Sequence, residues 1–516
     1  MVDSISADYK LMTNSSEMQT NHVTPTASRR YRRLPACSLC EPWNFFSDSP
    51  KLASSHQSHH GGSYSPPSPS PKKERGRGRG CQLLVFSPNF SRTAAPRKPP
   101  SSAGTSEKHH HHALSTVTLW AILLTFFLTS QAMALEPNTP IVYGLPAGAL
   151  PKAKAKITSG DPSLKPAYHK LIQDADKALK VKPLSVMDKP KAGASGDKHD
   201  YYSTAPYFWP DRNKPDGLPY IRRDGFKNPD SHNESSDSPR IVKMATTVHT
   251  LALAYYFTGK EDYAKHAAKL LRVWFLDPST KMNPNFNQAQ AVPGLYTGRG
   301  TGMVESRNLT SVMDAVGLLQ GSSHWSKADQ GAMVSWMKDF LDWAQTSKIG
   351  KAEKVAKNNH GSFYDMQTTH MALFTGQKEL AKTIVESAKT NRIALQFKPD
   401  GSQPLELARE DSFGYSKFNL QALFDLAGLG EYVGVDLWHY PTPDAPSLKR
   451  GLDFLLPYAE DSAKEWPYEH EKKASHGLQP LLRQAWLIYR DERYLKAVHQ
   501  APGAERERDA LFYPLQ

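Results

Sequence analysis

Cysteine is almost absent from this 516-residue chain, which contains three, at positions 37, 40 and 81. No cysteine follows Ala134, so no disulfide can stabilise the later part of the chain. Cys37 and Cys40 have the spacing of a metal or redox site. No second pair follows them, and a lone pair is a weak signal. We therefore predict no metal site.

Residues 1–112 lack sustained apolar periodicity and are rich in Ser, Pro, Arg and His. Such a composition cannot bury enough apolar surface to offset the entropy lost on ordering. We predict a disordered, low-complexity extension, or an artefact of the gene model. The run Arg75-Gly76-Arg77-Gly78-Arg79-Gly80 could contact nucleic acid, but runs of this kind are more often solvated. We expect no nucleic-acid partner.

Long hydrophobic runs are also missing, with one short exception in residues 113–130, where Leu119–Leu128 is apolar. Ala132-Met133-Ala134 follows it, and a short apolar stretch ending in A-x-A is typical of a secretory signal peptide. The alternative is a single signal-anchor helix, at the short edge of what a membrane span needs. We favour a signal at 113–134 and a secreted protein, periplasmic in a bacterium, over a membrane-anchored one.

Strand-like alternation is scarce, whereas helical periodicity runs from Arg240 nearly to the end. Two pairs of helices share one design, with Phe257-Thr258-Gly259 in the first pair echoed by Phe374-Thr375-Gly376 in the second. Repeated αα-hairpins indicate a solenoid or a closed toroid. We predict an all-α (α/α) toroid for residues 135–516, long enough for one large domain. The helices expected are Leu164–Val181, Ile241–Phe257, Tyr263–Phe275, 303–320, 330–347, Met366–Phe374, Leu380–Leu395, 416–428 and 446–457, with a weaker third pair around 487–490 and 494–497.

Several segments do not fit this pattern. Residues 136–160 resemble an extended arm, and 200–229 form a long loop because Pro and Gly are too dense for regular structure. The aromatic side chains of Tyr207 and Trp209 suit sugar rings, and Arg222 suits carboxylates, although packing alone would also explain them. The amide- and glycine-rich stretch 282–303, which contains Arg299, is typical of a rim loop near a polar ligand.

Two dense stretches carry the chemistry. Asn358-Asn359-His360-Gly361 is followed about fifty residues later by 404–415, with Arg409 and Tyr415. An amide and a guanidinium can stabilise charge that develops on a carboxylate, and an imidazole and a phenol can move protons. Each residue also has an ordinary explanation: a cap or core group for the histidine, a surface ion pair for the arginine, packing for the tyrosine and a helix cap for Asn358.

Together these motifs resemble the alginate lyase superfamily of polysaccharide lyases over roughly residues 145–500. The matching pieces, in chain order, are the Asp-Tyr-x-Ser-x-Ala-Pro-Tyr-x-Trp-Pro loop at 200–210, Lys-Pro-Asp-Gly-Leu-Pro-Tyr-Ile-Arg-Arg-Asp-Gly at 214–225, Met-Asn-Pro-Asn at 282–285, Gly-Arg-Gly-Thr-Gly at 298–302, Asn-Asn-His-Gly at 358–361, and Leu-Glu-Leu-Ala-Arg at 405–409 with Tyr415. The loop at 200–225 is typical of fungal and environmental bacterial relatives.

The resemblance implies a helical toroid that cleaves a 1,4-linked uronic acid polymer, such as alginate or glucuronan, by β-elimination. It implies that Asn359, His360, Arg409 and Tyr415 are catalytic. One tyrosine can serve as base and acid if the C5 proton and O4 leave from one side, whereas His360 is the better base if they leave from opposite sides. We expect substrate contacts from Tyr207, Trp209, Arg222, Arg299, Asn358 and His370, the last with packing inside a helix as its alternative.

The expected partner is an acidic polysaccharide, in keeping with the net charge of +13. We expect a monomer and no cofactor, because the substrate's own carboxylate serves as the electron sink. Two rivals remain. A glycoside hydrolase on an (α/α) toroid would need two carboxylates, for which Glu406, Glu410 and Asp411 are available. A non-catalytic polysaccharide-binding protein would need only the aromatic loop.

Overall fold

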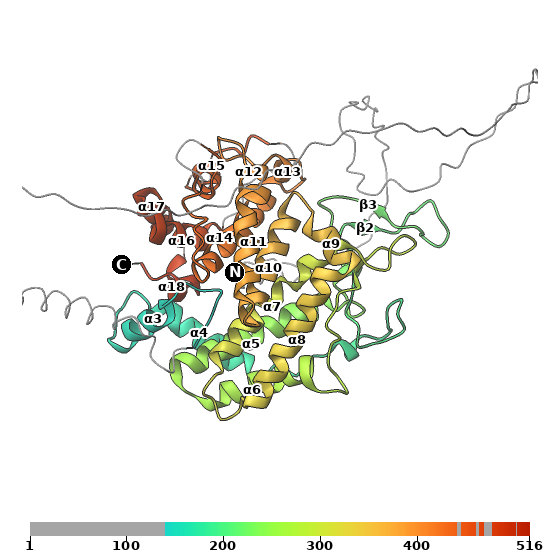
Figure 1. Cartoon of the computed structure of the whole chain (residues 1–516), viewed down its shortest axis with the longest axis horizontal. Coiled ribbons are helices and arrows are strands. Elements are labelled where there is room, and N and C mark those ends of the chain that lie inside the picture. The colour runs from blue at the N-terminus through green and yellow to red at the C-terminus, as the bar shows by residue number, and fades with distance from the viewer. Residues whose placement is uncertain (1–139, 441–444, 461–463, 469–476, 502, 516) are drawn as a thin grey trace, which may run out of the picture. The chain divides into compact units, whose positions relative to one another are not determined.

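The computed structural model describes residues 140–440, 445–460, 464–468, 477–501 and 503–515. Helices make up most of this part of the chain (Figure 1). The α-helices are α3 (Ala149–Thr158), α4 (Lys165–Ala178), α5 (Ser238–Thr258), α6 (Glu261–Leu271), α7 (Asn308–Leu318), α8 (Lys327–Thr346), α9 (Lys348–Lys354), α10 (Asn359–Phe374), α11 (Lys378–Ala388), α12 (Ala394–Gln396), α13 (Pro404–Leu407), α14 (Ser412–Glu431), α15 (Leu448–Glu460), α16 (Gln479–Tyr489), α17 (Glu492–Gln500) and α18 (Asp509–Phe512).

Short elements connect them. The 3-10 helices are η1 (Val186–Asp188), η2 (Pro229–His232), η4 (Gly300–Arg307) and η6 (Ala504–Arg506), and the π-helical turns are η3 (Arg272–Leu276) and η5 (Lys389–Ile393). The strands are β1 (Tyr202–Thr204), β2 (Phe208–Trp209), β3 (Ile221–Arg222) and β4 (Gln288–Ala291).

The helices form an inner and an outer layer, and their sequences explain which is which. Helices α5 and α10 bury most of their residues, and α14 buries more than half, so none of them shows one polar face; α10 includes buried polar residues such as Asp365 and Gln367. Helices α6 and α11 are amphipathic, with Lys and Glu on the outward face and Ala, Leu and Val inward. Within each hairpin an inner helix packs on an outer one, α5 on α6 and α10 on α11. Contacts of α5 with α7 and of α10 with α14 join successive hairpins.

The predicted hairpins are confirmed. Gly259 follows α5 with φ 70° and Gly376 follows α10 with φ 79°, a left-handed conformation that glycine adopts without strain and that ends a helix. The weaker third pair is also present as α16 and α17. There Arg490 takes the same left-handed position with φ 52°.

Two expectations about the N-terminal part of the domain are wrong. The supposed extended arm contains α3, whose Ala, Leu and Lys residues favour a helix and whose Pro151 lies in the first turn, where no backbone N–H is needed. The loop at 200–229 is not wholly irregular, since β2 pairs antiparallel with β3 and β1 pairs parallel with β4. These pairs are only two to four residues long, too short to leave a periodic pattern.

Polar bonds fix the start of this loop to neighbouring segments. Asp200 accepts hydrogen bonds from Nδ2 of Asn283 at 2.9 Å and of Asn285 at 3.2 Å. Lys189 and Asp237 form a buried ion pair of 2.9 Å, and Asp237 also accepts the backbone N–H of Tyr202. The amides that we expected near a ligand therefore hold the start of the loop.

Candidate active site

Asn359 is the first residue of α10 and is fixed by a buried carboxylate. Glu406 of α13 accepts the Asn359 backbone N–H through Oε1 at 2.6 Å and the Asn359 side chain Nδ2 through Oε2 at 2.7 Å. Both residues are almost fully buried. Glu406 thereby satisfies a backbone donor at the start of α10, which otherwise has no partner inside the helix. Nδ2 keeps its second hydrogen for another acceptor.

His360 follows and is oriented by a second carboxylate. Its Nδ1 lies 2.7 Å from Oε1 of Glu353, near the end of α9. The Glu353 side chain is 3 % exposed and that of His360 is 17 % exposed, so the imidazole reaches solvent while its partner does not. An ionised carboxylate only accepts hydrogen bonds, so Nδ1 must carry the proton. In the neutral ring, Nε2 is then the unprotonated nitrogen.

Arg409 lies just after α13 and pairs with the loop at 200–229. Its Nε and Nη2 donate to the two oxygens of Asp224 at 2.9 and 2.8 Å, the two-pronged geometry of a strong arginine–carboxylate pair. Burial opposes ionisation of Asp224, but the bonds from Arg409 outweigh it and hold the pKa of Asp224 below its usual value. The pair is mostly buried, with 16 and 22 % of the two side chains exposed.

Tyr415 lies in the first turn of α14, close to Arg409. The guanidinium carbon of Arg409 is 3.7 Å from the centre of the Tyr415 ring. The Tyr415 hydroxyl donates to the hydroxyl of Tyr207 at 2.8 Å. Burial, followed by the nearby Tyr207, raises the pKa of Tyr415 above its usual value, so the phenol retains its proton at neutral pH.

Glu406 connects the two stretches. It bonds to Asn359, and its carboxylate interacts electrostatically with both His360 and Arg409. Burial raises the pKa of Glu406, and the bonds from Asn359 oppose that rise. Glu406 therefore links three of the four residues for which we predicted catalysis, and the fourth, Tyr415, adjoins them through Arg409.

The predicted binding residues on the loops have different surroundings. Arg299 is largely buried, with its guanidinium 4.8 Å from the centre of the Phe208 ring. Burial, together with repulsion from Arg222, lowers the pKa of Arg299 to about 10. Arg222 is exposed and pairs with Asp224 at 3.1 Å. Trp209 donates from Nε1 to the Phe226 carbonyl at 2.9 Å, so its indole is anchored within the loop.

A family model described as alginate lyase matches residues 185–466. The crystal structure of an alginate lyase from Bacteroides ovatus is 39% identical, with a TM-score of 0.69, over 73% of this chain and 100% of that chain. The chain belongs to the alginate lyase family. It is therefore a polysaccharide lyase with the helical toroid of that family, as the motifs and hairpins predict.

Other solved alginate lyases are more distant. Alginate lyase A1-III from Sphingomonas species A1 is 17% identical with a TM-score of 0.41, over 71% of this chain and 95% of that one. A variant of A1-III complexed with a tetrasaccharide is 16% identical with a TM-score of 0.46, over 74% and 99% of the two chains. A comparison with curated protein sequences finds no match.

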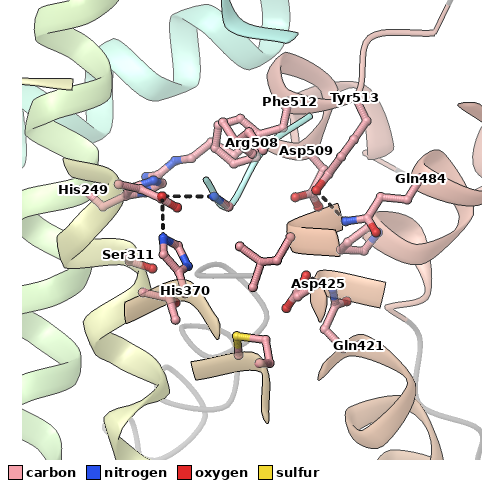
Figure 2. A pocket seen from close by; sticks show the side chains of 17 residues that line it. His249, Ser311, His370, Gln421, Asp425, Gln484, Arg508, Asp509, Phe512 and Tyr513 are labelled. Atoms are coloured by element: carbon pink, nitrogen blue, oxygen red, sulfur yellow. Dashed lines mark hydrogen bonds and ion pairs between the residues drawn. The ribbon is translucent and has the colours of Figure 1, made fainter. Parts of the chain in front are cut away.

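Two further predicted binding residues of this alginate lyase family member, His370 and Asn358, lie on or next to α10. His370 is buried ten residues along α10 from His360, about 15 Å away by helical rise. Its Nε2 lies 3.1 Å from Oδ1 of Asp314, but the angles do not form a hydrogen bond. Both residues line a cavity that Asp425 also lines (Figure 2). Asn358 precedes α10, but its side chain accepts no capping bond, contrary to the capping interpretation.

Sequence reasoning missed Glu353 and Asp224, and it considered Glu406 only as a hydrolase acid. Glu353 lies among lysines, as a surface residue would, and Asp224 is separated from Arg409 by 185 positions. No sequence signal identified these partners. Among the residues that the structure describes, no group of three or more His, Cys, Asp or Glu side chains is arranged to hold a metal ion.

Proposed function

We propose that alginate is the substrate of this polysaccharide lyase, and that Asn359, His360, Arg409 and Tyr415 carry out the elimination. The observation that carries this assignment is the buried Glu406. It bonds to Asn359 and interacts with His360 and Arg409, and Arg409 in turn lies against the ring of Tyr415. The likeness to the Bacteroides ovatus alginate lyase over the whole of that chain supports the choice of polymer.

The carboxylate of the sugar at the cleaved bond is bound by donors that the protein leaves unfilled. Asp224 uses Nε and Nη2 of Arg409, so Nη1 is available, and Asn359 retains one Nδ2 hydrogen. When the C5 proton leaves, negative charge spreads onto this carboxylate. Fixed donors in a water-poor site stabilise that charge more than they stabilise the ground state.

Proton transfer is divided between His360 and Tyr415. His360 Nε2 takes the C5 proton, because Glu353 keeps the other proton on Nδ1. The electron pair of the C5–H bond forms the C4–C5 double bond, and the C4–O4 bond breaks. Tyr415, whose raised pKa keeps the phenol protonated, gives its proton to O4. One product fragment ends in a new reducing end, which keeps O4. The other begins with an unsaturated uronate at its non-reducing end.

Two of the three candidate acids of the rival hydrolase, Glu406 and Asp411, already have partners within the protein. Glu406 accepts two bonds from Asn359, and Asp411 accepts the backbone N–H of Gly414 at 3.0 Å at the start of α14. A hydrolase needs one acid free to protonate the leaving oxygen and another facing the sugar. Both of these carboxylates are instead committed to local structure.

We also propose secretion by the segment 113–134, with a disordered 1–112 before it and a monomeric catalytic domain at 135–516. Residues 1–139 lie outside those that the structure describes. Among the described residues, no helix is long and apolar enough to cross a membrane. Asn233-Glu234-Ser235 and Asn308-Leu309-Thr310 match the N-glycosylation pattern. Asn233 is the better candidate, because it is exposed, whereas the Asn308 side chain donates to the Glu305 carbonyl.

The test is the near-ultraviolet absorbance of the C4–C5 double bond, followed separately on polymannuronate, polyguluronate and glucuronan. Mannuronate and glucuronate carry H5 and O4 on one face of the ring, whereas guluronate carries them on opposite faces. We expect absorbance to rise on an alginate polymer with the wild type and not with Tyr415→Phe. A rise only on glucuronan would change the substrate, and new reducing ends without absorbance would refute elimination.

A further inference from the structure

Arg307, the last residue of η4, is a partly buried cation with unused hydrogen-bond donors. Its Nη1 donates to the Val304 carbonyl at 2.9 Å, within its own turn. In the described chain no carboxylate lies within ion-pairing distance of this guanidinium, which has four further N–H groups. The residue nevertheless keeps part of its surface accessible to water.

The surroundings of Arg307 do not neutralise it. Burial lowers the pKa of Arg307, and the neighbouring Glu305 only partly offsets this. The Glu305 carboxylate is itself occupied, with hydrogen bonds from Tyr201 and Ser203 at 2.7 Å each. A buried charge without a partner is costly, and a bound anion is one way to compensate it.

Arg307 lies next to the aromatic residues that join the two catalytic helices. Its guanidinium carbon is 5.5 Å from the centre of the Phe418 ring, and Phe418 is 4.1 Å from Phe363, centre to centre. Phe418 follows Tyr415 by three residues on α14, and Phe363 follows His360 by three on α10. Residues three apart share a helix face, so the two phenylalanines lie about one helical turn, roughly 5 Å, from the level of the proposed catalytic groups. Arg307 packs on Phe418 and is therefore a neighbour of that turn.

Arg299 has the same design. Its guanidinium lies over Phe208. Its Nε donates to the Gln290 carbonyl and its Nη2 to Oε1 of Gln290, both at 3.1 Å. No carboxylate of the described residues forms an ion pair with it. Arg409, by contrast, already has Asp224 as a partner. Arg307 and Arg299 therefore have no carboxylate partner among the described residues, unlike Arg409.

We propose that Arg307 binds a second carboxylate of the polymer, that of a uronate next to the sugar at the cleaved bond. The planar guanidinium suits a carboxylate bound by two parallel hydrogen bonds, and Phe418 supports its flat face. Because every residue of a uronan carries a carboxylate, a second one is always present near the first. This inference rests on the proposed function and adds a binding group to the same site.

The test measures binding separately from turnover. In the Tyr415→Phe background of the full chain, calorimetry with a guluronate tetramer compares the protein that keeps Arg307 with Arg307→Met. Guluronate has H5 and O4 on opposite faces, as separate base and acid residues require, and methionine keeps roughly the length of the side chain. Loss of a charge-assisted hydrogen bond should weaken binding roughly 10- to 100-fold. A tetramer with its carboxylates reduced to alcohols should bind both proteins equally. An unchanged dissociation constant with the acidic tetramer would overturn the proposal.

Two control variants distinguish binding by the Arg307 guanidinium from a general effect of removing a positive charge. Arg506→Met removes an exposed arginine, whose side chain is 72% exposed, and should leave binding unchanged. Arg307→Lys keeps the charge without the planar fork and should recover only part of the affinity. With Tyr415 intact, Arg307→Met should raise KM with little change in kcat; a fall in kcat alone would contradict a binding role. If Tyr415→Phe still turns over polymer, the proposed function fails, while the binding comparison still decides the role of Arg307.

Discussion

Replacing Glu353 by glutamine tests the assignment of His360 as the base. Glu353 accepts one short bond from Nδ1 and is nearly buried, so water cannot take its place. A hydrogen bond to a charged group contributes about 1.5–3 kcal/mol, a factor of roughly 10 to 150 in rate if it is needed only for the reaction. General base catalysis as a whole contributes about 10²- to 10⁴-fold. Glu353→Gln should therefore lower kcat by roughly 10- to 150-fold, and His360→Ala by more.

The assay is the initial rate of unsaturated uronate formation, together with the ¹⁵N resonances of the His360 ring. In the wild type we expect the proton on Nδ1. A glutamine can turn its amide N–H toward Nδ1, which would move the proton to Nε2. Glu386→Gln is the matched control, because Glu386 is a half-exposed acid of α11 paired with Lys389. If Glu353→Gln kept full kcat, or lost activity with the ring proton still on Nδ1, the tautomer argument would be wrong.

Three further predictions concern Glu406 and Gly361, which position α10, and Asp425 in the cavity beside His370. Glu406→Gln puts an amide N–H against the donors of Asn359. We expect thermal unfolding to show a loss of about 1–3 kcal/mol of stability, and initial rates to show kcat/KM lowered at least tenfold. Gly361→Ala places a Cβ 2.1 Å from the Ala356 carbonyl oxygen, so the first turn of α10 must shift; activity should fall about 100-fold, and wild-type rates would refute this. Burial raises the pKa of Asp425 to about 7. The folded state then holds a proton that the unfolded state releases, so stability falls as pH rises from about 4 to 7. Asp425→Asn should raise the melting temperature more at pH 8 than at pH 5, and an equal gain at both would contradict the shift.

The sequence predicted the helical layers because their causes are local. Gly259 and Gly376 end helices by their own backbone freedom, and the amphipathic α6 and α11 show their outward faces in their composition. It also marked the start of α10 and the tyrosine of α14 as places of chemistry. The boundaries were less accurate: α10 begins at Asn359, whereas the periodic pattern begins only at Met366, since its first turns carry polar residues buried against Glu406 and Arg392.

The partners of the site could not be predicted, because they depend on contacts between distant segments. Asp224 meets Arg409 across 185 positions, and nothing in a loop rich in Pro and Gly indicates which acid will face the site. The alternative explanation of Arg409 as a surface ion pair is half right. Arg409 does form an ion pair, but the pair is mostly buried and lies beside Tyr415. This has a consequence for charge. An arginine already bonded to a carboxylate stabilises a second one less than a free arginine does. A site that must bind a polyanion therefore needs further cations, and Arg307, placed over the ring of Phe418, is the one that we propose for a second carboxylate.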